Sequence, residues 1–125
     1  NIKVIRTIPE FPDIRIVSDR HRLSQVLTHI VSNAVKFTDE GEIEIGYQKN
    51  SSTFKIFVRD TGVGIPVKKQ KAIFERFTKV NNDKNRLYGG TGIGLTISKG
   101  LMNLMKGKIR VESEQGEGST FSLEL

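Results

Sequence analysis

The sequence contains no cysteine, no tryptophan and only three prolines, and it has no long apolar segment. The absence of cysteine excludes a disulfide framework and thiol chemistry, and it suits a reducing compartment. No segment approaches the roughly 18 consecutive apolar residues of a membrane-spanning helix, and the first residues lack the apolar core of a signal peptide. We therefore expect a soluble domain with a cytoplasmic location and no membrane contact of its own.

The composition is that of one globular domain with a basic surface. The 125 residues include 36% hydrophobic residues and seven phenylalanines, enough for a single core over residues 1–125. The formal net charge of +6 indicates either an anionic partner or a solvated basic surface. A nucleic-acid-binding module would need exposed aromatic residues among its lysines and arginines. Most aromatic residues here occupy expected core positions, so we expect no nucleic-acid partner.

Apolar spacing predicts two long helices and one short helix. The first covers residues 23–38, with Asp19 as its N-cap. Its buried face is expected to contain Leu23, Val26 or Leu27, Ile30, Ala34 and Phe37. The second covers residues 94–106, with Gly107 beyond its end. Its buried face is expected to contain Ile97, Leu101, Leu104 and Met105. A short helix is expected from Pro66 to about residue 74.

Apolar strand segments separated by turn residues complete the expected fold. The expected strands are residues 2–8, 14–18, 43–47, 54–58, 108–114 and 119–125. The pair 43–47 and 54–58 forms a hairpin that delivers Asp60 to the end of a strand. Residues 78–88 have no apolar period and are expected to form a mobile loop. The sequence therefore predicts an α/β two-layer sandwich, in which about three helices cover a mixed β-sheet.

Two glycine-dense segments are the most informative features of the chain. Residues 60–64 read Asp-Thr-Gly-Val-Gly, and residues 89–95 read Gly-Gly-Thr-Gly-Ile-Gly-Leu. The second segment enters a helix, where free N–H groups and the helix dipole favour an anion. It is not a P-loop, because Leu95 stands where that loop requires lysine. Asp-Thr-Gly also occurs in aspartic proteases, but these are mostly β proteins with an apolar residue before the aspartate. Here Arg59 precedes Asp60 and two long helices flank it, so we do not expect a protease.

Four motifs follow one another along the chain. They read Asn-Ala-Val-Lys-Phe-Thr at residues 33–38, Asp-Thr-Gly-Val-Gly-Ile at 60–65, Phe-Glu-Arg-Phe at 74–77, and the glycine cluster at 89–95. In this order they resemble the ATP-binding catalytic domain of two-component sensor histidine kinases, from about Val17 to the C-terminus. The resemblance implies the Bergerat-type ATP-binding fold, ATP and Mg²⁺ as cofactors, and protein histidine kinase activity.

The resemblance also implies a nucleotide site. Asp60 would accept a hydrogen bond from the exocyclic amine of adenine and so discriminate against guanine. Gly62 and Gly64 would let the backbone pass close to the base. Apolar walls from Ile65 and Phe37, and a water-mediated contact from Thr120 to the aspartate, would complete this end of the site. The remaining ATP-binding residues would be Gly90, Thr91, Gly92, Ile93, Gly94 and Leu95.

One face of the first helix carries polar residues. Gln25, His29, Asn33 and Lys36 are spaced to share it, and a solvated face is the usual meaning of such a stripe. Asn33, however, is a poor helix former with no cap to serve. The resemblance implies that Asn33 binds Mg²⁺, which prefers oxygen ligands, and that Lys36 contacts the phosphates. His29 replaces the usual asparagine, and would either accept a proton from water or hydrogen-bond Mg²⁺-bound water.

A lid over the phosphates is expected between the short helix and the second glycine cluster. Its phenylalanine side chains would anchor the lid to the core. Each of its lysine and arginine side chains could contact phosphate or simply face solvent. The residues concerned are Phe74, Arg76, Phe77, Lys79, Lys84 and Arg86.

The implied reaction is transfer of the γ-phosphoryl group of ATP to a histidine. The acceptor motif of the family is absent, and both histidines, His21 and His29, fall on the first helix. The expected partners are therefore a phosphoacceptor domain elsewhere in the parent protein, whose membrane anchoring is left open, and a downstream response-regulator receiver domain. Two alternatives remain: a degenerate domain that only binds nucleotide, and a self-contained gyrase- or chaperone-type ATPase, which would need glutamate at position 29.

Overall fold

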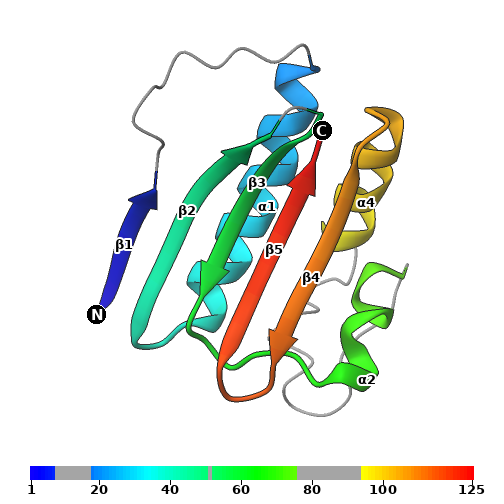
Figure 1. The fold of residues 1–125 in the computed structure, drawn as a ribbon. Helices are drawn as coiled ribbons and strands as arrows, with labels where there is room; N and C mark the ends of the chain where they lie inside the picture. The colour runs from blue at the N-terminus through cyan, green and yellow to red at the C-terminus, as the bar shows by residue number, and fades with distance from the viewer. Residues whose placement is uncertain (8–17, 51, 76–93) are drawn as a thin grey trace.

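A five-stranded mixed sheet carries the helices on one of its faces (Figure 1). The computed structural model describes residues 1–7, 18–50, 52–75 and 94–125. The strands are β1 (Ile2–Thr7), β2 (Gly41–Lys49), β3 (Phe54–Asp60), β4 (Lys108–Glu114) and β5 (Gly118–Glu124). Their order is β1-β2-β3-β5-β4, with β1 parallel to β2 and every other pair antiparallel. The predicted α/β sandwich with a mixed sheet is confirmed.

The first helix, α1 (Arg20–Phe37), follows its sequence pattern closely. Asp19 caps it as expected, because the Asp19 carboxylate accepts the N–H of Arg22 at 3.0 Å. The helix therefore begins at Arg20, before the predicted residue 23. The buried side chains are Val26, Ile30, Ala34 and Phe37, as the apolar spacing predicted, whereas Leu23, predicted on the same face, is only partly buried.

The second long helix, α4 (Gly94–Leu104), buries a different face from the predicted one. Ile97 and Leu104 are 39% and 64% exposed, whereas Ser98 and Met102 are fully buried. The α4 helix packs beside α1 (Figure 1), and a small serine at the contact lets the two helices approach. Only Leu101 and Met105 of the predicted stripe pack against the core. Because serine is polar, the apolar spacing did not identify the face of α4 that contains Ser98 as the buried one.

The short helical region is less regular than predicted. It consists of α2 (Val67–Gln70) and a 3-10 turn, η1 (Ala72–Phe74). Pro66 precedes α2 with an extended ψ of 140° and is not its first helical residue. The predicted loop at 78–88 falls outside the described residues. So does the predicted strand at 14–18, apart from Ser18, which lies in a bend.

The two faces of the sheet differ in character. The core lies between the sheet and the helices, and includes Ile43, Val58, Phe121 and Leu123 at 4% exposure or less. The opposite face carries ion pairs between neighbouring strands, such as Arg59 with Glu44 at 3.3 Å. Since the core lies on the helix side of the sheet, a buried site is expected on that side.

Within the described residues, no helix has both the length and the apolar character needed to cross a membrane.

Truncation of Ile30 tests this core. The Ile30 side chain is 1% exposed, so Ile30→Ala should lower the free energy of unfolding by about 2–5 kcal/mol through lost burial and a residual cavity. Val35 lies on the same helix at 51% exposure, and Val35→Ala should change stability by only about 0.5 kcal/mol. Urea denaturation of both variants measures the difference. Equal effects would contradict the assigned buried face of α1.

Candidate functional site

A buried carboxylate occupies the end of the central strand β3. Asp60 is its last residue, pairs with Ser119 of β5, and is only 4% exposed. The N–H of Gly62 donates to its Oδ1 at 2.9 Å, and the backbone N–H of Ser119 donates a second hydrogen bond. Burial raises the pKa of Asp60, and these two bonds lower it, but the net pKa stays above the ordinary value. The carboxylate is thus held in place and poorly solvated.

The turn after Asp60 is squeezed between two other parts of the backbone. A Cβ atom on Gly62 would collide with the carbonyl oxygen of Phe37, at the end of α1. Gly64 has a φ of +69°, and its Cβ would collide with the carbonyl oxygen of Glu114, at the end of β4. Both glycines were predicted to allow a close approach to a base. In the structure they allow a close approach of the turn to the protein's own backbone.

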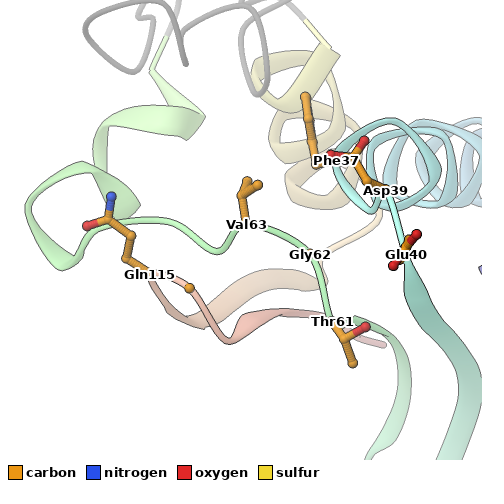
Figure 2. A pocket seen from close by; sticks show the side chains of 8 residues that line it. Phe37, Asp39, Glu40, Thr61, Gly62, Val63 and Gln115 are labelled. Carbon is orange, nitrogen blue, oxygen red and sulfur yellow. The ribbon is translucent and has the colours of Figure 1, made fainter.

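A cavity of about 380 Å³ opens beside this turn, a volume within the range of small-molecule sites. Figure 2 shows its position between the end of α1, the turn after β3 and the β4–β5 turn. Two predicted nucleotide-site residues, Phe37 and Gly62, line it. The other lining residues are Asp39, Glu40, Thr61, Val63, Gln115 and Gly116. The acidic side chains Asp39 and Glu40 make this rim unfavourable for phosphates.

One residue of the polar face of α1, His29, contacts α4. His29 is half-buried, and its Nδ1 lies 3.3 Å from the Oγ of the fully buried Ser98. Asn33, one turn further along, is also half-buried. Lys36 is exposed near the end of the helix, with its Nζ 5.5 Å from the centre of the Phe37 ring. Because Nδ1 of His29 faces Ser98, any contact of this imidazole with water or a ligand falls to Nε2.

The structure bears on whether Asn33 fits a magnesium ion. Asn33 is half-buried on α1, and its side-chain amide oxygen is of the hard type that Mg²⁺ prefers. The described part of the chain contains no cluster of three or more His, Cys, Asp or Glu side chains that could hold a metal without help. A single amide oxygen suits Mg²⁺ that is bound mainly through the oxygens of a nucleotide. The residue type of Asn33 fits such an ion, and its role as a ligand stays a prediction.

Thr120 is not placed where the sequence reading put it. Alternation along β5 puts Thr120 opposite Arg59 and Glu112, on the face away from the helices. Ser119 points to the helix side instead, and its backbone N–H is the group that bonds to Asp60. Because Ser119 is two residues from the buried Phe121, strand periodicity could have found it.

Ile65 also departs from its predicted place. Its side chain is 0% exposed and belongs to the hydrophobic core, so none of it forms an open wall of the site. The Ile65 backbone is engaged by two residues that the sequence reading missed. Ser113 Oγ accepts its N–H at 2.7 Å, and Gln70 Nε2 donates to its carbonyl oxygen at 3.0 Å. Neither residue belongs to a glycine or asparagine motif, so no sequence signal marked them.

Part of the predicted phosphate end and lid lies outside the described residues. These are Arg76, Phe77, Lys79, Lys84, Arg86, Gly90, Thr91, Gly92 and Ile93. Gly94 begins α4, and Leu95 is buried in the core at 3% exposure. Phe74 meets Phe121 edge to face, with ring centres 6.3 Å apart. The short helical region is thus attached to the core immediately before the predicted lid.

The fold and this site define a class of protein. The chain belongs to the family of histidine kinase-, DNA gyrase B-, and HSP90-like ATPases, whose profile matches residues 18–125. Within this family it is a catalytic domain of the sensor histidine kinase type.

Several relatives support this assignment. The chain is 44% identical over 119 residues to the sensor histidine kinase AruS of Pseudomonas aeruginosa, covering 87% of this chain and 12% of the relative. It is 41% identical over 116 residues to the sensor histidine kinase RcsC of Escherichia coli, covering 91% of this chain and 12% of the relative. The chain thus spans only about an eighth of the length of these relatives.

Solved structures agree with the sequence relatives. Full-length ShkA in complex with AMPPNP matches with a TM-score of 0.84 and 31% identity, over 98% of this chain and 25% of ShkA. The nucleotide-free catalytic domain of the histidine kinase ThkA matches with a TM-score of 0.82 and 28% identity, over 99% of this chain and 78% of that domain.

The raised pKa of Asp60 predicts a pH-dependent effect on stability. Because the folded state binds this proton more tightly than the unfolded chain, ionisation of Asp60 opposes folding above its folded-state pKa. This cost disappears below the ordinary value of 3.8. The stability of Asp60→Asn relative to the parent chain should therefore increase as the pH rises from about 3.8 to neutral.

Urea denaturation over this pH range measures the trend. The control is Glu112→Gln, which changes an exposed carboxylate on the open face of the sheet. If the stability of Asp60→Asn relative to the parent chain instead decreases with rising pH, the two N–H bonds lower the pKa of Asp60 more than burial raises it.

Proposed function

We propose that this domain binds ATP with Mg²⁺ and donates the γ-phosphoryl group to a histidine on a separate phosphoacceptor domain of its parent protein. A response-regulator receiver domain would act downstream. The observation that carries the proposal is the buried Asp60 carboxylate, fixed by two backbone N–H groups beside the glycine turn. The presence of AMPPNP in the similar structure of ShkA supports a nucleotide at this site.

Asp60 supplies the base specificity. An ionised carboxylate accepts a hydrogen bond from the exocyclic amine of adenine, whereas the carbonyl oxygen of guanine would face it with like polarity. The two backbone bonds of Asp60 fix its orientation before the ligand arrives, and its low exposure of 4% strengthens a hydrogen bond made there. The preference for adenine then follows from one side chain in a rigid setting.

Asn33 and Lys36 would act at the phosphate end. The Asn33 oxygen would hold Mg²⁺, and the exposed Lys36 ammonium would reach the phosphates from the end of α1. When bound, Mg²⁺ would neutralise charge on the phosphate oxygens. Phosphoryl transfer depends mainly on positioning and charge neutralisation, so these residues need no covalent role. His29, oriented by Ser98, would hydrogen-bond water near the phosphates through Nε2.

The geometry supports an acceptor outside this chain. His29 is half-buried against α4 and bonded to Ser98, so it is poorly placed for in-line attack. His21 is exposed about two helical turns before His29, near the start of α1 and far along it from Asn33. The second candidate function is a regulatory domain that binds nucleotide without transferring phosphate, because His29 stands where the family usually has asparagine.

Base selectivity provides a direct test. The domain should bind ATP with a marked preference over GTP, and Asp60→Ala should weaken ATP binding by about 1.5–3 kcal/mol, roughly ten- to a hundredfold. Isothermal titration calorimetry measures both affinities. Glu112→Ala, on the open face of the sheet, should leave them unchanged. Equal affinity of the parent domain for ATP and GTP would refute the assignment of Asp60.

Phosphoryl transfer tests the complete proposal. Incubated alone with labelled Mg²⁺-ATP, the domain should acquire no phosphohistidine, and addition of the acceptor domain should produce it there. Asn33→Ala should slow this transfer by roughly tenfold or more, because an oxygen ligand is lost. Ser32→Ala, at the exposed neighbouring position, is the matched control. Acid-labile phosphate on the isolated domain that disappears in His21→Ala or His29→Ala would place the acceptor within this chain.

A further inference from the structure

We infer that Ser113 is a positioning residue for nucleotide selectivity, which fixes the turn after Asp60 against the β4–β5 hairpin. The inference rests on the proposed function, since it concerns how this site distinguishes adenine from guanine. Ser113 lies near the end of β4, opposite Ser119, and is half-buried on the helix side of the sheet.

The Ser113 hydroxyl joins three separate groups. It accepts the N–H of Ile65 at 2.7 Å, donates to the carbonyl oxygen of Gly118 at 2.8 Å, and lies 2.8 Å from the Oγ of Ser119. A hydroxyl has one proton to donate and two lone pairs. With its proton on Gly118, the Ser119 hydroxyl must donate to Ser113, and every member of the cluster is satisfied.

Ser113 also belongs to a bracket around the Ile65 backbone. Gln70 Nε2 donates to the carbonyl oxygen of Ile65 at 3.0 Å and to that of Ser113 at 2.7 Å. Ile65 thus has its N–H and its carbonyl group bonded to side chains, outside any strand ladder. Since Ile65 is 0% exposed, loss of the Ser113 hydroxyl would leave a buried N–H without an acceptor.

The same hairpin holds both ends of the recognition turn. At the start of the turn, the Ser119 N–H bonds to Asp60. Further along, the Gly116 N–H bonds to the carbonyl oxygen of Val63 at 2.7 Å, and at the end Ser113 holds Ile65. Ser113 and Ser119 contact each other through their hydroxyl groups. A change at Ser113 is therefore transmitted to the group that orients the Asp60 carboxylate, although Ser113 itself touches no base.

The test compares Ser113→Ala and Ser113→Thr with Ser122→Ala. Ser122 is buried nearly as fully as Ser119, at 4% against 3% exposure, but it is paired with Phe57 and Arg110 and lies on the other side of the sheet. Calorimetric titration with ATP and with GTP gives the selectivity of each variant, and urea denaturation gives its stability.

Ser113→Ala should weaken ATP binding by about three- to tenfold and leave GTP binding nearly unchanged, so the ATP/GTP ratio should fall. Ser113→Thr keeps the hydroxyl and should retain the parent ratio. Ser122→Ala should also retain it, whatever its effect on stability. A purely structural serine would lower the stability and leave the ratio intact, and that result would overturn the inference.

Gln70→Ala tests the same bracket independently, at a second residue. It removes the bonds to the Ile65 and Ser113 carbonyl oxygens and should lower the ATP/GTP ratio in the same direction. It decides the question if Ser113→Ala does not fold, and an unchanged ratio would then refute the role of the bracket. Failure of the parent domain to bind ATP would refute the proposed function. A selective parent with an equally selective Ser113→Ala variant would refute only the role of Ser113.

Discussion

Burial of the Asp60 carboxylate is the constraint on which the rest of the site depends. An ionised group removed from water must recover hydrogen bonds from the protein, and Asp60 receives them from the N–H groups of Gly62 and Ser119. Those donors belong to a turn and to a neighbouring strand. The same turn passes close to the ends of α1 and β4, where a Cβ on Gly62 or Gly64 would collide with the backbone. The buried carboxylate thus lies beside a turn that three segments approach closely.

The contact between α1 and α4 is the second organising feature, and a polar pair lies within it. Ser98 is fully buried, and its hydroxyl lies 3.3 Å from His29. A small side chain there allows close packing of the helices, and its hydroxyl offers His29 a partner as the imidazole leaves water. Asn33 lies one helical turn beyond His29, on the same face of α1. The contact between the two helices thus lies beside the proposed phosphate end.

The sequence reading succeeded where local periodicity carries the information. The buried face of α1, the Asp19 cap, the two hairpins and Asp60 at the end of β3 all follow from spacing over a few residues. It failed at α4, where the buried face includes a serine, and at Thr120, where a shift of one position along β5 changes the face of the sheet. The short region after Pro66 has too few residues for a period to fix its helical type.

By itself, the sequence determined the order of elements, the mixed α/β architecture and the family, because regular strands and helices and ordered motifs are written in residue spacing. Only the tertiary structure decided which groups surround Asp60 and what holds the turn beside it. Ser113, Gln70 and Ser119 come from separate elements, and no local pattern records that they meet. Their convergence depends on strand register and on backbone donors, which every residue except proline possesses and which the sequence therefore does not distinguish.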